Sequence, residues 1–461
     1  MTTSQRPTLL MLGTDRYALR ACVEHDIDAV VVWGPGGRDN GFVDVPGGLR
    51  VLPVDDQSSV EAIMMALHRA GLADHRFAGV QTTDEWALVT ASLLAAHLGC
   101  DFIDPGTAVH FRDKSLQKKR VRAAGLKAAR VTVIDDVHDV SGLDELPYAK
   151  AVLKPIAGAG AARTSVVESV ADVRALSAEY RKAQTKQRTF ALEEFVTGDE
   201  WTADGILFDG ELLFCSFATY ARPCVTLVSE DLPLSLRRFD PDRDPAVYDL
   251  GLPVVRRALE ALGLRDGVFH MELFHDAGTG ELAFGECAAR RGGVLVHEEL
   301  QAKFGVNLAE SAVLCAIGRR PDPQVKVDPR VIGGGFLMGR PGTLIKCPAP
   351  AEITARPGVL FARVERPYGT RVVGELSSTN QRIAQCLVAA DSEEEFAGRL
   401  AEVRAWFDEQ VVMLPDVVTN RERRSWQRET WPAFPTTAAS ASPSPRPWPR
   451  PARPFAWAAG R

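Results

Sequence analysis

The sequence lacks the features that mark several classes of protein. Its eight cysteines are scattered and no two are spaced as Cys-x-x-Cys, which argues against zinc ligands and a disulfide framework. No apolar run is long enough to span a bilayer, and the N-terminus lacks the layout of a signal peptide. The formal net charge of −6 indicates no basic surface for nucleic acid or membranes. We therefore expect a cytoplasmic protein with reduced thiols that binds neither nucleic acid nor a membrane.

The length and composition indicate an ordinary globular protein. A chain of 461 residues with 46% hydrophobic and 25% charged residues is expected to form two or three domains. Near the N-terminus, apolar runs at 8–12, 29–33 and 79–82 alternate with helix-like stretches, which predicts a parallel sheet covered on both faces. The turn after the first run reads GTDRYA, so the GxGxxG fingerprint of dinucleotide-binding proteins is absent.

A second unit is expected to open with a helix at 113–125, with an aspartate as its N-cap and a glycine as its stop. This helix is rich in lysine and arginine, and we expect its cations other than Lys114 to face solvent. A strand at 152–155 ends in Lys154 and Pro155 and leads into the loop IAGAGAAR. Glycine lets a backbone approach an oxyanion closely, so this loop is either a phosphate-binding loop or a flexible connector.

Two glutamates stand where half-buried strands would normally carry hydrophobic residues. Glu272 lies in HMELF and Glu286 in AFGECAAR, and the turn composition DAGTGE between them predicts a hairpin. Because side chains alternate along a strand, the two carboxylates share a face only if Glu272 lies opposite Glu286. Such a pair suits a hard cation such as Mg²⁺, which commonly shares its ligands with substrate phosphates. The alternative is two solvent-exposed glutamates on an amphipathic hairpin.

Further candidates for a nucleotide site follow one another along the chain. They include cations for the phosphate charge and a glycine-rich loop for the phosphate oxygens. They also include a strand end that could bind the edge of adenine, and a carboxylate that could accept hydrogen bonds from ribose hydroxyls. Taken alone, each cation or carboxylate is better explained as a salt-bridged surface residue. The candidates are Lys114, Lys154, Gly158, Gly160, Ala161, Glu193, Glu194, Val196 and Glu200.

The C-terminal part of the chain is less informative. Residues 330–412 mix glycine-rich turns with short strands and are expected to end in a helix near 392–410. The final segment, 416–461, is rich in Pro, Ala, Ser and Arg and cannot bury a core. We expect it to be a linker and a disordered tail.

The order and spacing of these segments resembles the ATP-grasp superfamily, closest to its carboxylate–amine ligases and their biotin-carboxylase-like relatives. The motifs are DK…AAGL, VLKPIAGAGA, LEEFVTGDEWTADG, FHMELF and GECAARRGG, and the resemblance covers roughly residues 8–412. It implies an α/β, Rossmann-like pre-ATP-grasp domain followed by an α+β ATP-grasp domain. The implied limits are 1–110 for the first domain, 111–325 for the second with a lid at about 130–200, 326–415 for its C-terminal part, and 416–461 for the tail.

This resemblance implies ATP as the cofactor, together with Mg²⁺ or Mn²⁺. Lys114 and Lys154 would contact the phosphates, and the loop 157–162 would close over them as a lid. Glu272 and Glu286 would bind the metal ions. The other implied nucleotide contacts are Glu193, Glu194 and Val196 for adenine and Glu200 for ribose.

Arg290 matches the arginine of the family's E-x-N-x-R pattern and would stabilise the acyl phosphate and its transition state. The chain departs from that pattern at Ala288, where the family often has a metal-binding Asn. Coordination would then depend on the two glutamates, phosphates and water. Ala161 replaces the Ser or Gly of many members, so one phosphate contact would come from backbone alone. The candidates for the substrate pocket are Glu85, Arg291 and His297, and each is also explicable as a structural residue.

The implied function is that of an ATP-dependent carboxylate–amine ligase, which forms an amide or peptide bond through an acyl phosphate and releases ADP and phosphate. Its partners would be a small carboxylic or amino acid, an amine, and a second copy in a homodimer. Two alternatives stay open. One is a bicarbonate-activating enzyme like biotin carboxylase, although the chain has no biotinylation motif. The other is a non-catalytic ATP-binding scaffold, which Ala288 favours.

Overall fold

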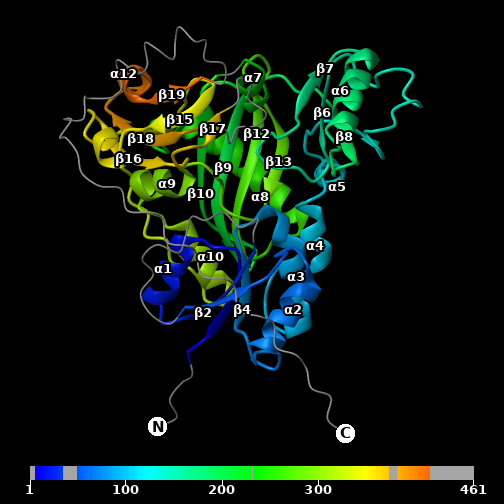
Figure 1. Cartoon of the computed structure of the whole chain (residues 1–461), viewed down its shortest axis with the longest axis vertical. Helices are drawn as coiled ribbons and strands as arrows, with labels where there is room; N and C mark the ends of the chain where they lie inside the picture. The colour runs from blue at the N-terminus through cyan, green and yellow to red at the C-terminus, as the bar shows by residue number, and fades with distance from the viewer. Residues whose placement is uncertain (1–5, 35–48, 231, 373–381, 416–461) are drawn as a thin grey trace, which may run out of the picture. The chain divides into compact units, whose positions relative to one another are not determined.

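The computed structural model describes residues 6–34, 49–230, 232–372 and 382–415 (Figure 1). The chain divides into a compact unit, Met1–Leu414, and a second unit, Pro415–Arg461. The tail expected at 416–461 therefore lies outside the described residues. No helix within the described ranges is long and apolar enough to cross a membrane.

The N-terminal part contains the parallel sheet that the alternating pattern predicts. Its elements are β1 (Thr8–Leu12), α1 (Arg16–Glu24), β2 (Asp28–Trp33), β3 (Arg50–Pro53), α2 (Val60–Arg69), β4 (Gly79–Thr82), the 3₁₀ turn η1 (Glu85–Ala87) and α3 (Leu88–Leu98). The strand order is β3-β2-β1-β4, and every pair is parallel. Strand β1 is buried at every position because apolar clusters cover both faces of the sheet. The turns that follow β1 and β4 both reach the cavity described below.

A small antiparallel sheet carries the glycine-rich loop. Its elements are β5 (Val131–Ile134), β6 (Ala151–Pro155), β7 (Ser165–Val167), α6 (Val170–Lys182) and β8 (Phe190–Glu194), and α4 (Pro105–His110) and α5 (Lys114–Ala123) precede it. The strand order is β5-β8-β6-β7. Leu153, Val173 and Phe190 pack in one core between this sheet and α6. Because β6 pairs with β7, the loop between them is held at both ends.

The largest sheet has eight strands, in the order β13-β12-β9-β10-β11-β14-β18-β16, and a three-stranded sheet has the order β17-β15-β19 (Figure 1). The strands are β9 (Asp199–Phe208), β10 (Glu211–Tyr220), β11 (Ser235–Arg238), β12 (Gly267–Asp276), β13 (Glu281–Ala288), β14 (Val331–Leu337), β15 (Gly342–Lys346), β16 (Val359–Val364), β17 (Arg371–Val372), β18 (Ala384–Ala390) and β19 (Val412–Leu414). The helices of this region are α7 (Cys224–Ser229), α8 (Pro245–Leu262), α9 (Val296–Phe304), α10 (Leu308–Ala316), α11 (Pro350–Thr354) and α12 (Glu393–Gln410).

Side-chain alternation along β12 separates the core from the cavity. Phe269 and Met271 are buried in the core that includes α8. His270 and Glu272, each of which follows a core residue in the sequence, line the cavity. The period of two that characterises strands therefore explains why polar residues interrupt an apolar run here.

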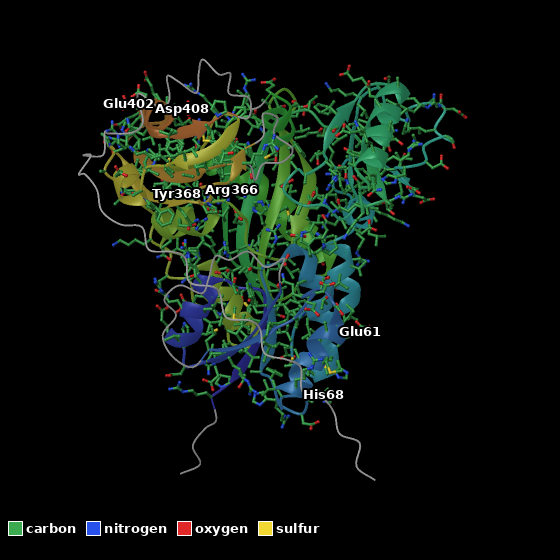
Figure 2. All side chains as sticks on the ribbon, viewed as in Figure 1. Glu61, His68, Arg366, Tyr368, Glu402 and Asp408 are labelled. Atoms are coloured by element: carbon green, nitrogen blue, oxygen red, sulfur yellow. The ribbon has the colours of Figure 1, made fainter. Side chains whose placement is uncertain are left out.

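Helices at the surface show the corresponding helical pattern. On α2, Ile63, Ala66 and Leu67 are buried, whereas Glu61 and His68 are exposed (Figure 2). On α12, buried Val403 and Phe407 alternate with exposed residues that include Glu402 and Asp408 (Figure 2). Each helix therefore packs through one apolar stripe.

A buried amide fixes α5 against β13. Gln117 is 2% exposed, and its Nε2 donates to the carbonyl oxygen of Cys287 at 2.7 Å. The backbone N–H of Cys287 donates in return to Gln117 Oε1 at 2.9 Å. This paired contact places α5, with its lysines, directly beside Glu286.

Replacing Gln117 by Ala should lower the free energy of unfolding by about 1–3 kcal/mol, because two buried backbone groups of Cys287 would lose their partners. Urea denaturation of the purified variant measures this change. Lys119→Ala is the matched control, since Lys119 lies on the same helix but is exposed. Equal stability of both variants would show that the amide contact contributes little.

Candidate active site

A cavity of about 870 Å³ collects most of the residues singled out in the sequence. Its walls come from the turns after β1 and β4, the start of α5, the loop between β6 and β7, the end of β8, and the strands β12 and β13. Residues 290–294 and 363–365 also contribute to the lining. A site assembled from so many separate segments depends on tertiary packing.

The two glutamates predicted to face each other do so. Glu272 pairs with Glu286 in the antiparallel register of β12 and β13, with a bulge at the next position. Both side chains line the cavity, so the required register is confirmed. Burial and the nearby charge of Glu286 raise the pKa of Glu272. For Glu286, burial acts in the same direction, but Lys114 and Lys154 outweigh it and lower its pKa to about 2.

These carboxylates fit a hard divalent cation. Glu272 lies opposite Glu286, and burial together with the charge of Glu286 raises the pKa of Glu272; Mg²⁺ or Mn²⁺ would relieve the repulsion between the two carboxylates. Within the described ranges, no group of three or more His, Cys, Asp and Glu side chains could hold a metal. Glu272 and Glu286 are the candidate ligands because they lie opposite each other and both line the cavity, and phosphates and water would supply the other oxygens.

Three lysines surround the carboxylates. Lys114 Nζ lies 2.9 Å from Glu286 Oε1, and Lys154 Nζ lies 3.6 Å from Glu286 Oε2. Glu193 lies between Lys154 and Lys118, at 3.0 and 2.9 Å. This half of the cavity is suited to a polyphosphate, because several cations lie beside the candidate metal-binding carboxylates.

The expectation that Lys118 faces solvent is wrong. Lys118 is 3% exposed and lines the cavity. The physical reason is helical spacing, since Lys114, Gln117, Lys118 and Val121 share the buried face of α5. The spacing of four residues from Lys114 was the signal in the sequence that would have identified Lys118.

The glycine-rich loop lies next to the lysines. Gly158, Gly160 and Ala161 all line the cavity. The carbonyl oxygen of Gly158 accepts a hydrogen bond from Lys114 Nζ at 2.9 Å. Gly160 and Ala161 have positive φ angles of 62° and 52°, and such a conformation costs more for alanine than for glycine. The loop thus keeps a strained turn at the phosphate half of the cavity.

The four residues assigned to adenine and ribose have different surroundings. Glu193 is bound to lysines, and the carboxylate of Glu194 pairs with exposed Arg130 at 2.8 Å. Val196 lines the cavity. Glu200 is buried, and burial and Glu272 raise its pKa to about 8. It accepts from the backbone N–H of Cys224 at 2.7 Å, so it also holds the start of α7.

The other end of the cavity contains arginine–carboxylate pairs. Glu85 lies 2.5 Å from Arg290 Nε and accepts a hydrogen bond from Arg112 at 2.7 Å. Arg291 pairs with Asp15 at 2.9 Å. Glu85 and Arg291 both line the cavity, as expected of substrate residues, but both already have partners of opposite charge. No pattern in the sequence links Glu85 to Arg290.

His297 does not line the cavity with the other described residues. It is buried and stacks on Tyr17, with ring centroids 3.7 Å apart. Burial and Arg291 lower its pKa to about 4, so it is neutral at physiological pH. Tyr17 occupies the cavity wall instead, and the prediction of His297 as a substrate contact is corrected.

A residue not singled out, His270, also reaches the cavity. Its Nδ1 lies 2.7 Å from Asp204 Oδ1, and Asp204 Oδ2 pairs with Arg238 at 2.7 Å. Arg238 pairs in turn with Glu299 at 2.9 Å. Burial alone would raise the pKa of Asp204, but His270 and Arg238 lower it to about 2. The sequence showed His270 only as a neighbour of Glu272 on the same strand face.

The chain is similar to known ligases in sequence and in fold. The L-arginine-specific L-amino acid ligase of Bacillus subtilis is 25% identical over 357 residues, which cover 76% of this chain and 83% of that protein. The fold matches that of an L-amino acid ligase from Bacillus licheniformis with a TM-score of 0.70, at 18% identity, over 90% of this chain and all of the other.

Biotin carboxylase from Campylobacter jejuni, solved in complex with a nucleotide, matches with a TM-score of 0.60 at 14% identity, covering 92% of this chain and 95% of that chain. No protein-family model matches. The likenesses to solved structures establish the fold. Together with the L-amino acid ligase relative, they confirm the resemblance to the ATP-grasp ligases.

Proposed function

We propose that the chain, an ATP-grasp ligase of the carboxylate–amine type, joins a small carboxylic acid to an amine and releases ADP and phosphate. One observation carries this proposal. The carboxylates Glu272 and Glu286, with their lysines, line the same cavity as Arg290. The part of the cavity suited to phosphates therefore adjoins the part suited to an oxyanion, as phosphoryl transfer to a carboxylate requires.

The proposed reaction has two steps. A carboxylate oxygen of the acid attacks the γ-phosphorus of ATP, so that an acyl phosphate forms and ADP leaves. The amine nitrogen then attacks the acyl carbon, phosphate leaves, and a proton is lost from nitrogen. Activation is needed because oxide is a poor leaving group from a carboxylate, whereas phosphate is a good one.

Residues of the chain would supply positioning and charge. Lys114 and Lys154 would neutralise the transferring phosphoryl group. Glu272 and Glu286 would hold Mg²⁺ or Mn²⁺, which when bound supplies further positive charge to the phosphates. Arg290 would stabilise the oxyanion that forms when the amine attacks. The loop 157–162 would exclude water from the acyl phosphate.

The acid is proposed to be an amino acid. The relative from Bacillus subtilis is named as specific for L-arginine, and it is similar over 76% of this chain. Glu85 and Arg291 line the end of the cavity beyond the phosphate half and are the proposed contacts for the amino acid. We also propose cytoplasmic action, a pre-ATP-grasp domain at 1–110 and an ATP-grasp domain beginning at 111.

The test is to offer ATP and Mg²⁺ with a panel of amino and carboxylic acids, with and without amines, and to measure ADP, AMP and product mass. ADP and phosphate that appear with particular acids, together with an amide mass, would support the proposal and identify the substrate class. AMP release would contradict it. A bicarbonate arm with free biotin examines the biotin-carboxylase-like alternative, and ATP binding without turnover in any arm would favour a scaffold.

Replacing Lys154 by Ala should weaken ATP binding and reduce turnover together. Lys154 pairs with Glu193 and lies 3.6 Å from Glu286, so its charge belongs to the phosphate half. We expect the Kd for ATP, measured by calorimetry, to rise about tenfold or more, since a charged hydrogen bond contributes about 1.5–3 kcal/mol. Lys150→Ala is the control, because Lys150 is exposed and pairs with Glu168. An unchanged Kd would remove Lys154 from the phosphate site.

A further inference from the structure

Arg112 connects two segments that lie on different sides of the cavity. It lies between α4 and α5 and is 9% exposed. Its Nη1 donates to Glu85 Oε1 at 2.7 Å, and its Nη2 donates to the carbonyl oxygen of Ala157. The guanidinium also lies over the ring of Trp86, 4.9 Å from its centroid. One side chain therefore links the turn after β4 to the start of the glycine-rich loop.

The segment 112–114 holds three successive carbonyl groups of that loop. The carbonyl of Ile156 accepts from the backbone N–H of Lys114 at 3.1 Å, and that of Gly158 accepts from Lys114 Nζ at 2.9 Å. Arg112 holds the carbonyl between them, at Ala157. Lys114 Nζ also lies 2.9 Å from Glu286 Oε1, whereas Arg112 also donates a hydrogen bond to Glu85. The start of the loop is thus fixed relative to both halves of the cavity.

Glu85 bridges two arginines. Oε1 accepts from Arg112, and Oε2 lies 2.5 Å from Arg290 Nε. Burial would raise the pKa of Glu85, but Arg290 and Arg112 lower it below its ordinary value, so the carboxylate is ionised at neutral pH. Charged hydrogen bonds to a planar carboxylate fix direction as well as distance. The direction of the Arg290 guanidinium therefore depends on how Glu85 is held.

We propose that Arg112 is a positioning residue, which joins the glycine-rich loop to Glu85 and through Glu85 orients Arg290 towards the reacting carbonyl. This inference rests on the proposed ligase function. Arg112 does not line the cavity with the described lining residues, so it acts through Glu85 and the loop. When the loop is in place, Arg290 is held where it can stabilise the oxyanion that forms as the amine attacks the acyl carbon. When Arg112 is lost, the loop and Arg290 are no longer coupled, and water gains access to the acyl phosphate.

The experiment compares Arg112→Gln and Arg112→Lys with the wild type, measuring amide and ADP in the same reaction and the Kd for ATP separately. In Arg112→Gln we expect amide formation to fall up to about a hundredfold, the cost of a small misplacement of reacting groups. ADP should exceed amide because water intercepts the acyl phosphate, and the Kd for ATP should change little. In Arg112→Lys the rate of amide formation should lie between those of Arg112→Gln and the wild type, because an ammonium group cannot reproduce the paired contacts with Glu85 and Ala157.

Arg120→Gln is the matched control. Arg120 also donates to a backbone carbonyl, that of Ala261 at 2.8 Å, but it is exposed and lies away from the cavity lining. This variant should form amide and ADP in equal amounts at the wild-type rate. Thermal unfolding of each variant shows whether it is folded.

The outcomes separate this inference from the proposed function. If the wild type forms no amide with any acid and amine, the ligase proposal fails first. If the wild type forms amide, and folded Arg112→Gln retains its rate with equal ADP and amide, the positioning role is overturned. The same holds if Arg112→Gln loses amide and ADP formation equally, in proportion to lost stability, and Arg112→Lys does not restore the rate.

Discussion

Replacing Glu286 by Gln is expected to lower ATP turnover about a thousandfold or more while the fold is retained. The change removes a candidate metal ligand, and metal-ion stabilisation of a transferring phosphoryl group contributes several kcal/mol, each 1.36 kcal/mol being tenfold in rate. It also removes the negative charge that pairs with Lys114 at 2.9 Å and Lys154 at 3.6 Å. Both effects reduce the order of the phosphate half of the cavity.

The measurement is the rate of ADP release at saturating substrates and over a series of Mg²⁺ and Mn²⁺ concentrations. A lost ligand should shift the metal dependence to higher concentration as well as lower the maximal rate. Glu281→Gln is the control, because Glu281 lies on the same strand but is exposed and pairs with Lys127. A rate for Glu286→Gln within a few-fold of the wild type would refute the metal assignment.

Replacing Arg290 by Met is expected to lower amide formation by about a hundred- to a thousandfold, as for the loss of one donor to a developing oxyanion. Arg290 lines the cavity and is held by Glu85, so its loss removes the positive charge proposed to face the oxyanion. ATP binding should persist, because Lys114 and Lys154 are unchanged. The rate of amide formation and the Kd for ATP together show whether catalysis is lost while ATP binding is kept.

A charge-conserving variant separates geometry from charge. Arg290→Met leaves Glu85 and Arg112 as a balanced ion pair among the described residues. Arg290→Lys keeps the positive charge but cannot reproduce the directed guanidinium contact, so it should recover only part of the lost rate. A wild-type rate of amide formation in folded Arg290→Met would refute the oxyanion role.

The parallel N-terminal sheet illustrates which features of the fold are set by the local sequence. The apolar runs at 8–12, 29–33 and 79–82 match β1, β2 and β4 closely, because strands buried on both faces need continuous hydrophobic residues. The strand β3 and the order β3-β2-β1-β4 were not predicted. Likewise, nothing in the sequence pattern indicated that β11 lies between β10 and β14 in the large sheet. Strand order depends on contacts between distant segments.

The sequence by itself determined the central pair of the site. Alternation along two strands and a turn between them predicted that Glu272 and Glu286 share a face if they lie opposite each other, and the register of β12 and β13 has them opposite. Lys154 was recognisable because it stands at the end of a strand beside the glycine-rich loop, and Lys114 because it stands at the start of a helix. These features are set by the period of a strand and by helix and turn signals, all of which act over a few residues.

The tertiary structure alone decided how the rest of the cavity is arranged. It buried Lys118 by turning one face of α5 towards β13, and it placed Tyr17 in front of His297. It also brought Glu85 and Arg112 to Arg290 from separate parts of the chain. Ion pairs of this kind depend on distances between side chains that packing sets, and no local pattern of residue types encodes those distances.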